Sequence, residues 1–208
     1  RYLDRILFLS DPGYWARLRG YADALKSRNR LLQESTTDDR ILASFEAPLA
    51  EHAVGLLARR RRLVERLGAS VNDILSRVAR WHDADVSLHY KSSVADEAWT
   101  RQGYRELLVR SRLRDARRGF TSVGPHTDDL DLRFHHGRAF RSFASQGQHR
   151  LLAIALKIAE MELLKEQTGS DPVLLLDDVS SELDRGHYEL FKAYLAGTGG
   201  QVFVTTTD

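Results

Sequence analysis

Hydrophobic positions in the first half of the chain recur at helical spacing. Apolar side chains fall every three or four residues over 14–32 and again over 42–67, so each stretch carries one apolar stripe. Asp11, followed by proline, is a typical helix cap, and the polar residues 35–39 separate the two stripes. The pattern predicts an antiparallel pair of helices, and Pro48 is expected to kink the second helix or to mark its boundary.

Shorter patterns follow these two stripes. Residues 71–81 favour a further turn or two of helix, 86–90 alternate as a strand does, and 96–118 again have helical spacing. Residues 120–123 are strand-like, a turn-rich link follows over 124–129, and 130–134 alternate again. His136-Gly137 offers a hairpin turn, so a β-hairpin is predicted over 120–143.

The last third of the chain contains both helix-like and strand-like hydrophobic patterns. A long amphipathic helix is predicted after Ser145, and the apolar run 173–176 is typical of a buried strand. A second helix over 185–196 leads to an apolar strand over 201–206. A strand, a helix and a second strand in this order form a right-handed crossover, so the two strands are expected to be parallel. The chain is therefore assigned to the α/β class.

Composition places the chain among soluble globular proteins. It has 208 residues, of which 42% are hydrophobic, and it contains no cysteine, which excludes disulfides and thiolate metal sites. No run of about 18 apolar residues is present, so no membrane span is expected. The chain begins at Arg1 and its single methionine is Met161, so we interpret it as a fragment of a longer protein.

Charge divides the chain into two parts. Residues 1–118 hold 23 Lys and Arg against 16 Asp and Glu, whereas 119–208 hold 8 against 13. We therefore predict a basic helical arm domain over 1–118 and an α/β lobe over 119–208 that contains the hairpin, both helices and both strands. Most of the basic residues are arginine, which favours bidentate phosphate contacts, although a GC-rich genome explains such an excess equally well.

Arginines cluster on the second helix of the arm. Four are consecutive and a fifth follows one turn later: Arg59, Arg60, Arg61, Arg62 and Arg66. Four successive positions cover every face of a helix, so some of these side chains must face solvent. The cluster is interpreted either as an ordinary solvated helix or as a strip that contacts nucleic-acid phosphates.

Two sites in the lobe carry residues suited to nucleotide chemistry. The strand 173–176 ends in Asp177 and Asp178, and ligands of open α/β folds bind outside the carboxyl ends of strands. One carboxylate suits Mg²⁺, and the other suits an attacking water. Ser145 heads a helix whose N-terminus favours phosphate. Taken singly, these residues also fit a buried strand with a polar end and a simple helix cap.

Four stretches together carry a family resemblance. They are Gly124–Asp129, Phe143–Gln148, Leu174–Asp184 and Gln201–Asp208. In this order they resemble the RecF family of ABC-type ATPases in the structural-maintenance-of-chromosomes branch. The resemblance implies a partial P-loop ATPase lobe with parallel strands and a helical arm. It extends over essentially the whole chain, specifically from residue 119 onward and loosely over 35–118.

The resemblance assigns roles to three residues at the head of the lobe's first helix. Ser145, Gly147 and Gln148 correspond to the signature motif, which caps the γ-phosphate of an ATP held by the other subunit. A phosphate-binding loop requires Gly-Lys, and this chain contains no Gly-Lys pair. The family places that loop before the point at which this chain begins. The fragment is therefore expected to supply half of an ATP site and not to hydrolyse ATP alone.

The remaining roles fall on the strand ends. Asp177 corresponds to the Walker B magnesium residue, and Asp178 stands where most ABC ATPases carry the glutamate that acts as catalytic base. Because aspartate is shorter, slow ATP turnover is expected of the complete protein. Asp184 corresponds to the D-loop at the dimer interface, and Thr207 to the switch position that holds histidine in many relatives.

The resemblance also implies a biological role. The complete protein is expected to be a cytoplasmic, ATP-dependent homodimer that binds gapped or junction duplex DNA and works with RecR and RecO to support RecA loading. Two alternatives stay open: a non-catalytic module that binds DNA or a partner protein, and a related ATPase of the same branch. The lack of a long coiled coil disfavours a double-strand-break repair relative.

Overall fold

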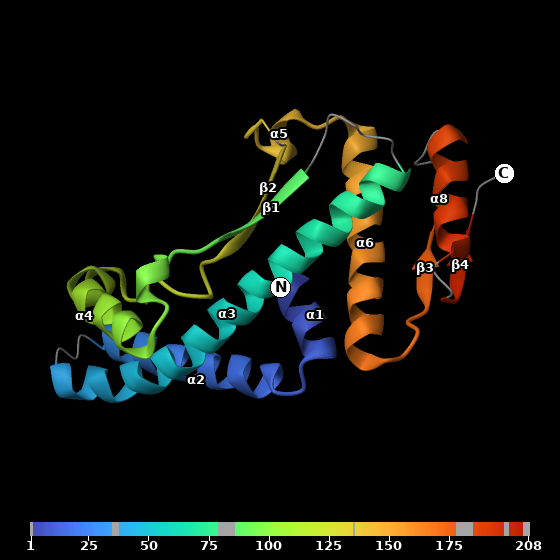
Figure 1. The fold of residues 1–208 in the computed structure, drawn as a ribbon. Coiled ribbons are helices and arrows are strands. Elements are labelled where there is room, and N and C mark those ends of the chain that lie inside the picture. The colour runs from blue at the N-terminus through green and yellow to red at the C-terminus, as the bar shows by residue number, and fades with distance from the viewer. Residues whose placement is uncertain are drawn as a thin grey trace. The chain divides into compact units, whose positions relative to one another are not determined.

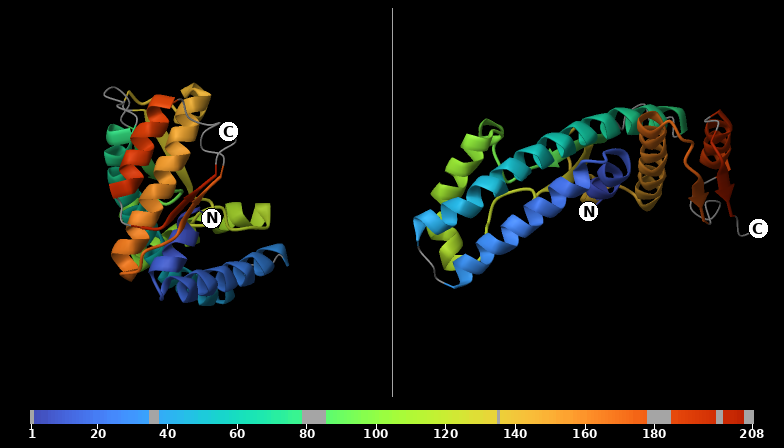
Figure 2. Two further views of the ribbon diagram at one scale, coloured as in Figure 1. Left: turned by 90° about the vertical axis from the view of Figure 1, so that its right-hand side faces the viewer. Right: turned by 90° about the horizontal axis from the view of Figure 1, so that it is seen from below.

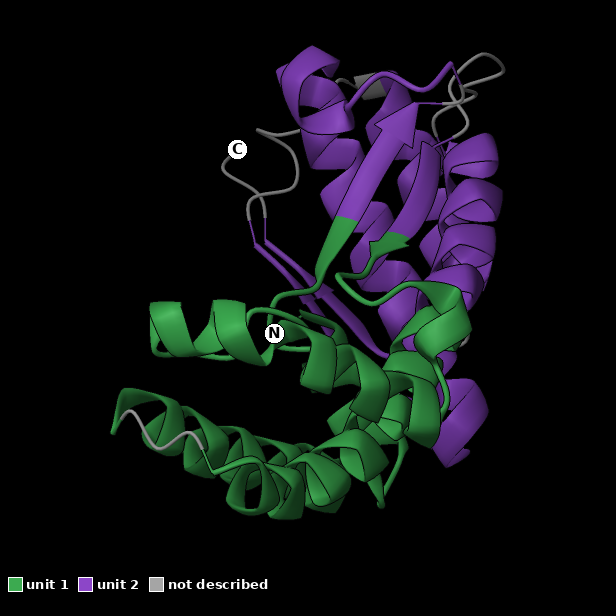
Figure 3. Cartoon of the chain, turned by 90° about the vertical axis from the view of Figure 1, so that its left-hand side faces the viewer, with its two compact units in different colours: residues 1–63, 90–130 green, residues 64–89, 131–208 purple. Residues whose placement is uncertain are grey.

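The computed structural model describes residues 2–34, 38–78, 86–134, 136–177, 185–197 and 200–205. They are mostly helical and include two small sheets. The chain forms two compact units (Figure 3), unit 1 with residues 1–63 and 90–130 and unit 2 with residues 64–89 and 131–208. This division does not coincide with the boundary predicted at residue 118, because the helix over 39–78 contributes to both units.

Unit 1 is built from helices. It contains α1 (Tyr2–Ser10), α2 (Tyr14–Gln33), the first part of α3 (Asp39–Val78), the 3₁₀ turn η1 (Asp96–Ala98) and α4 (Arg101–Arg118), all labelled or visible in Figure 1. The predicted cap at Asp11 is wrong by two residues. The Asp11 carboxylate accepts the Gly13 N–H at 2.9 Å, and Gly13 is the residue that precedes the first turn of α2.

Helix α3 continues through Pro48, so the helix boundary predicted at that proline does not occur. The same helix includes residues 71–78. The residues around Pro48 explain why the helix continues, since Leu49, Ala50, Ala53 and Leu56 are completely buried. Packing of this kind outweighs the local cost of proline. Among the described helices, α3 is also the one long and apolar enough to cross a membrane by length and composition, and 39% of that apolar window is buried inside the protein.

Unit 2 contains the rest of α3, the short α5 (Phe140–Phe143), α6 (Gln146–Thr168), β3 (Leu174–Leu176), α8 (Arg185–Gly197) and β4 (Val202–Val204). The two strands are parallel as predicted, with Leu174 opposite Val202 and Leu176 opposite Val204, and Figure 2 shows them side by side. Ile158 of α6 and Phe191 of α8 are fully buried.

Strands β1 (Val86–Lys91) and β2 (Asp129–Phe134) pair with each other. The hairpin predicted over 120–143 is therefore wrong in its first strand, because residues 120–123 form no strand. Their backbone N–H groups bond side chains and not a neighbouring strand. The Thr121 N–H donates to the Asn29 side chain at 2.8 Å, and the Ser122 N–H donates to the Asp115 carboxylate at 3.1 Å. The turn predicted at His136-Gly137 does form after β2, since the Phe134 N–H donates to the Arg138 carbonyl at 2.9 Å.

A buried ion-pair network lies inside unit 1. Arg28 of α2 has no exposed surface, and its guanidinium donates to Asp115 at 2.8 Å and to the Thr121 hydroxyl at 2.7 Å. Glu46 accepts from Arg28 at 3.3 Å and from Arg112 at 2.6 Å. The network thereby joins α2, α3 and α4.

Candidate functional site

The amino terminus of α6 is fixed by a reciprocal cap. The Gln148 N–H donates to Ser145 Oγ at 3.2 Å, and the Ser145 N–H donates to Gln148 Oε1 at 2.8 Å. Each side chain therefore satisfies a backbone donor of the other residue, which is the arrangement called a capping box. The prediction that Ser145 caps this helix is confirmed, and Gln148 is positioned by the same pair of bonds.

Gly147 lies in the first turn of α6, between the two capping residues. Gln146 and Gly147 are exposed, and within the described ranges no acceptor bonds the N–H of either residue. A Cβ atom added at Gly147 would meet nothing within 4 Å. Since glycine costs a helix roughly 1 kcal/mol relative to alanine and packing does not require it here, the position leaves space for an approaching group. Two free N–H groups at a positive helix end suit an anion.

Asp177 is exposed directly after β3 and lies beside the end of β4. The Thr205 hydroxyl donates to Asp177 Oδ1 at 2.5 Å, and the Thr205 N–H donates to the Leu176 carbonyl at 2.9 Å. The carboxyl ends of the two parallel strands thus meet. The sequence resemblance selected Thr207 and missed Thr205. Parallel pairing could have indicated Thr205, because Asp177 and Thr205 directly follow the paired residues Leu176 and Val204. Asp178, Asp184 and Thr207 lie outside the described residues.

The side chains near Asp177 that could ligate a metal decide whether Mg²⁺ fits at this strand end. The described residues hold no group of three or more His, Asp or Glu side chains placed to bind a metal. Mg²⁺ in nucleotide sites is held by one or two carboxylates, with phosphate and water supplying the remaining ligands. One exposed carboxylate at a strand end meets that requirement, so Asp177 fits as a magnesium ligand.

Most of the arginine strip on α3 is neutralised by carboxylates. Arg59 donates to Asp11 at 2.6 Å, and Arg66 pairs with Glu166 at 2.6 Å. Arg61 pairs with Asp96 at 2.9 Å.

Arg62 differs from the other members of the strip. It is exposed, and no carboxylate among the described residues pairs with it. The strip therefore offers little free positive charge.

Arg60 faces the interior of unit 1. It is 7% exposed, pairs with Asp4 at 2.8 Å and donates to the Pro125 carbonyl at 2.6 Å. Burial raises the pKa of Asp4, but a hydrogen bond from Tyr14 and the charge of Arg60 outweigh it and leave that pKa below its ordinary value. The geometry gives Arg60 a structural role and does not present it to a nucleic acid.

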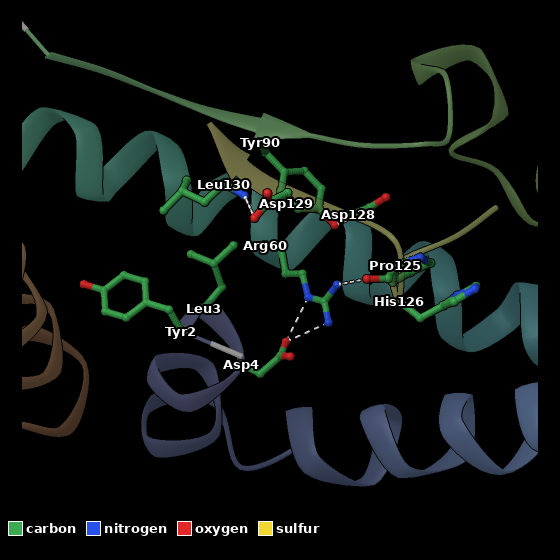
Figure 4. Close-up of a pocket in the computed structure, with 10 residues that line it drawn as sticks. All are labelled: Tyr2, Leu3, Asp4, Arg60, Tyr90, Pro125, His126, Asp128, Asp129 and Leu130. Carbon is green, nitrogen blue, oxygen red and sulfur yellow. Dashed lines mark hydrogen bonds and ion pairs between the residues drawn. The ribbon is translucent and has the colours of Figure 1, made fainter. Parts of the chain in front are cut away.

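A cavity of about 230 Å³ adjoins this ion pair (Figure 4). In Figure 4 the Arg60 guanidinium reaches both Asp4 and the Pro125 carbonyl. The Asp128 carboxylate accepts from the Tyr90 hydroxyl at 2.6 Å and from the Ser93 N–H at 2.8 Å. Arg60, Asp4 and Asp128, which line the cavity, thus already have partners in unit 1. We therefore interpret these groups as structural and do not assign a ligand to the cavity.

The stretch Gly124–Asp129 organises the same region. His126 Nε2 lies 2.9 Å from the Thr121 carbonyl, so this nitrogen must carry the proton that it donates. Nδ1 therefore accepts from the Tyr21 hydroxyl, 2.6 Å away. Both ring nitrogens are used in the neutral form, and burial lowers the pKa of His126 below 6.5.

We expect the His126 imidazole to titrate below pH 6.5 in an NMR titration of the folded protein. Its pKa in the unfolded chain is about 6.5, so acid favours the unfolded state, and this residue's contribution to stability is lost as pH falls below about 6.5. A titration midpoint above 6.5 would contradict the neutral, doubly bonded arrangement.

Comparison with known proteins identifies relatives along the whole chain. It is 42% identical to the DNA replication and repair protein RecF of Myxococcus xanthus and 40% identical to that of Anaeromyxobacter sp., covering all of this chain and 56% and 57% of those proteins. A solved structure of the recombination mediator protein RecF-ATP in the RecFOR pathway matches with a TM-score of 0.83 and 33% identity. The chain spans 56% of that protein too. No protein-family model matches.

Proposed function

Because this chain belongs to the RecF family, we propose that it supplies the half of an ATP site that acts on nucleotide held by a second subunit. Ser145, Gly147 and the free N–H groups of α6 would contact the γ-phosphate. The observation that carries this proposal is the open first turn of α6, where a glycine without packing contacts lies between two capping residues. Gln148 acts by holding Ser145 in place.

The strand ends supply the other groups. Asp177 would hold Mg²⁺, with Thr205 orienting its carboxylate through the observed hydrogen bond. Asp178 would orient the attacking water, Asp184 would lie at the dimer interface, and Thr207 would sense the nucleotide. ATP would supply the phosphoryl group on which Asp177 and Asp178 act.

One face of the β3–β4 pair is exposed. Leu175 and Phe203 lie opposite each other in register and are 72% and 53% exposed. Parallel sheets are normally covered on both faces. We therefore propose that further elements of a complete ATPase lobe cover Leu175 and Phe203.

At the level of the complete protein, we propose ATP-dependent dimerisation on gapped or junction duplex DNA in the cytoplasm, together with RecR and RecO. The solved RecF-ATP structure supports the nucleotide dependence. The basic balance of residues 1–118 supports binding to a polyanion.

Two substitutions at Ser145 separate its phosphate contact from its capping role. Asparagine and aspartate both cap helices about as well as serine, so Ser145→Asn and Ser145→Asp should fold equally well. Only aspartate places a negative charge against the γ-phosphate. We expect ATP-dependent dimerisation of the complete protein, measured by light scattering, to weaken at least about tenfold more in Ser145→Asp than in Ser145→Asn, roughly 1.4 kcal/mol.

Equal dimerisation of the two variants would restrict Ser145 to capping and would contradict the proposed ATP contact. Circular dichroism of both variants serves as the folding control.

A further inference from the structure

Helix α4 carries an exposed face rich in arginine. Its buried residues are Tyr104, Leu108, Ser111 and Asp115, which all lie on one side. Arginine occurs on the remaining surface at positions 101, 105, 110, 112, 114, 117 and 118. Arg101 pairs with Glu51 at 2.6 Å, and Arg112 pairs with Glu46 at 2.6 Å. These two belong to the ion pairs of unit 1. Arg110, Arg114, Arg117 and Arg118 share one side of α4 and form what we call the arginine face, whereas Arg105 lies on another side.

The arginine face differs from the strip on α3 in its charge balance. Among the described residues, no hydrogen bond, ion pair or ring contact engages the side chains of Arg105, Arg114, Arg117 and Arg118. Arg110 is 72% exposed and lies 3.8 Å from Glu106, at the outer limit of an ion pair. The strip on α3 is mostly neutralised, whereas the arginine face keeps its charge.

Helix stability accounts for only part of this composition. Basic residues in a last helical turn interact favourably with the helix dipole, which explains Arg117 and Arg118. Arg105, Arg110 and Arg114 lie too far from that end for the same effect. Four like charges on one face repel one another, so a partner of opposite charge would stabilise them.

We propose that this face, centred on Arg110, Arg114 and Arg117, contacts the phosphate backbone of duplex DNA. These three side chains are spaced by four and three residues, so they share one side of α4 over roughly 10 Å. Phosphates of one DNA strand follow each other at about 3.4 Å along the helix axis, so this length spans about three of them. Arginine is the side chain best suited to bidentate phosphate contacts. The proposal rests on the proposed DNA-binding function and adds the surface that performs it.

The test uses the complete protein with ATP and a short duplex of random sequence. Binding is measured from about 50 to 200 mM salt for the unsubstituted protein and for Arg110→Gln/Arg114→Gln/Arg117→Gln. Loss of three phosphate contacts is expected to reduce the slope of log K against log salt by about 2.7, and to do so equally for two unrelated sequences.

A matched control removes the same charge from other places. Arg30, Arg77 and Arg133 are all exposed but already pair with Glu34, Asp73 and Asp131 respectively. The variant Arg30→Gln/Arg77→Gln/Arg133→Gln should keep a slope within about one unit of the unsubstituted protein. Circular dichroism of both triple variants verifies that they fold.

Three outcomes would overturn the inference. An unchanged slope in the α4 variant would do so, and an equal loss in the control would show a general charge effect. Leu113 is 68% exposed on the same side of α4, so a variant that binds DNA normally but no longer binds RecR would identify a protein-docking surface instead. If the unsubstituted protein binds no duplex at all, the proposed function itself fails.

Discussion

Replacing Arg28 with methionine is expected to destabilise the protein by about 3–5 kcal/mol, measured by urea unfolding followed by circular dichroism. The guanidinium is fully buried and donates to Asp115 and Thr121, while its other side faces Glu46. Methionine would fill much of the space but leave two buried carboxylates short of their partner. Asp115 is completely buried, so water cannot replace the lost bond.

Helix α2 offers a matched control two residues away. Arg30 also pairs with a carboxylate, Glu34 at 2.8 Å, but its side chain is 80% exposed. Exposed pairs contribute about 0–1 kcal/mol, so Arg30→Met should lower the free energy of unfolding by no more than that. Equal effects of Arg28→Met and Arg30→Met would show that the buried network is not what holds α2, α3 and α4 together.

The sequence contained a signal for Arg28 that hydrophobicity alone could not interpret. The apolar stripe predicted over 14–32 includes Leu25 and Leu32, and Arg28 falls between them at helical spacing. It continues the buried face as a charged residue because carboxylates from α3 and α4 meet it there. A hydrophobicity pattern treats a charged residue at such a position as an interruption of the apolar stripe. The carboxylates that make its burial possible, Glu46 and Asp115, lie 18 and 87 residues away in the sequence.

Local signals predicted the site elements better than long-range ones did. The cap at Ser145 follows from residues three positions apart, and the parallel arrangement of the strands predicted at 173–176 and 201–206 follows from the order strand, helix, strand. Both are confirmed. The partner of β2 is β1, about 40 residues earlier, which no local turn signal could indicate. The same limit applies to the arginines of α3, because only the fold shows that Arg60 faces the interior.

Gly124→Ala is expected to cost about 2–5 kcal/mol, the sum of backbone strain and steric overlap. Gly124 has a φ angle of +133°, which residues with a side chain rarely adopt. A Cβ atom there would overlap the hydroxyl oxygens of Tyr104 and Tyr21. Those hydroxyls bond the Val123 carbonyl and His126, so moving them would disturb the centre of unit 1.

Gly137 separates the two contributions. It also has a positive φ, +83°, but a Cβ atom added there meets nothing within 4 Å. Gly137→Ala should therefore show the backbone strain alone, about 1–3 kcal/mol, and Gly124→Ala should exceed it. Removing one obstructing hydroxyl with Tyr104→Phe should then make Gly124→Ala less costly, a coupling that a double-mutant cycle measures directly. If the two glycine variants lose equal stability and no coupling with Tyr104 is found, the glycine is required by the turn alone. A larger cost relieved by Tyr104→Phe would show that Gly124 lets the two tyrosines pack against this loop.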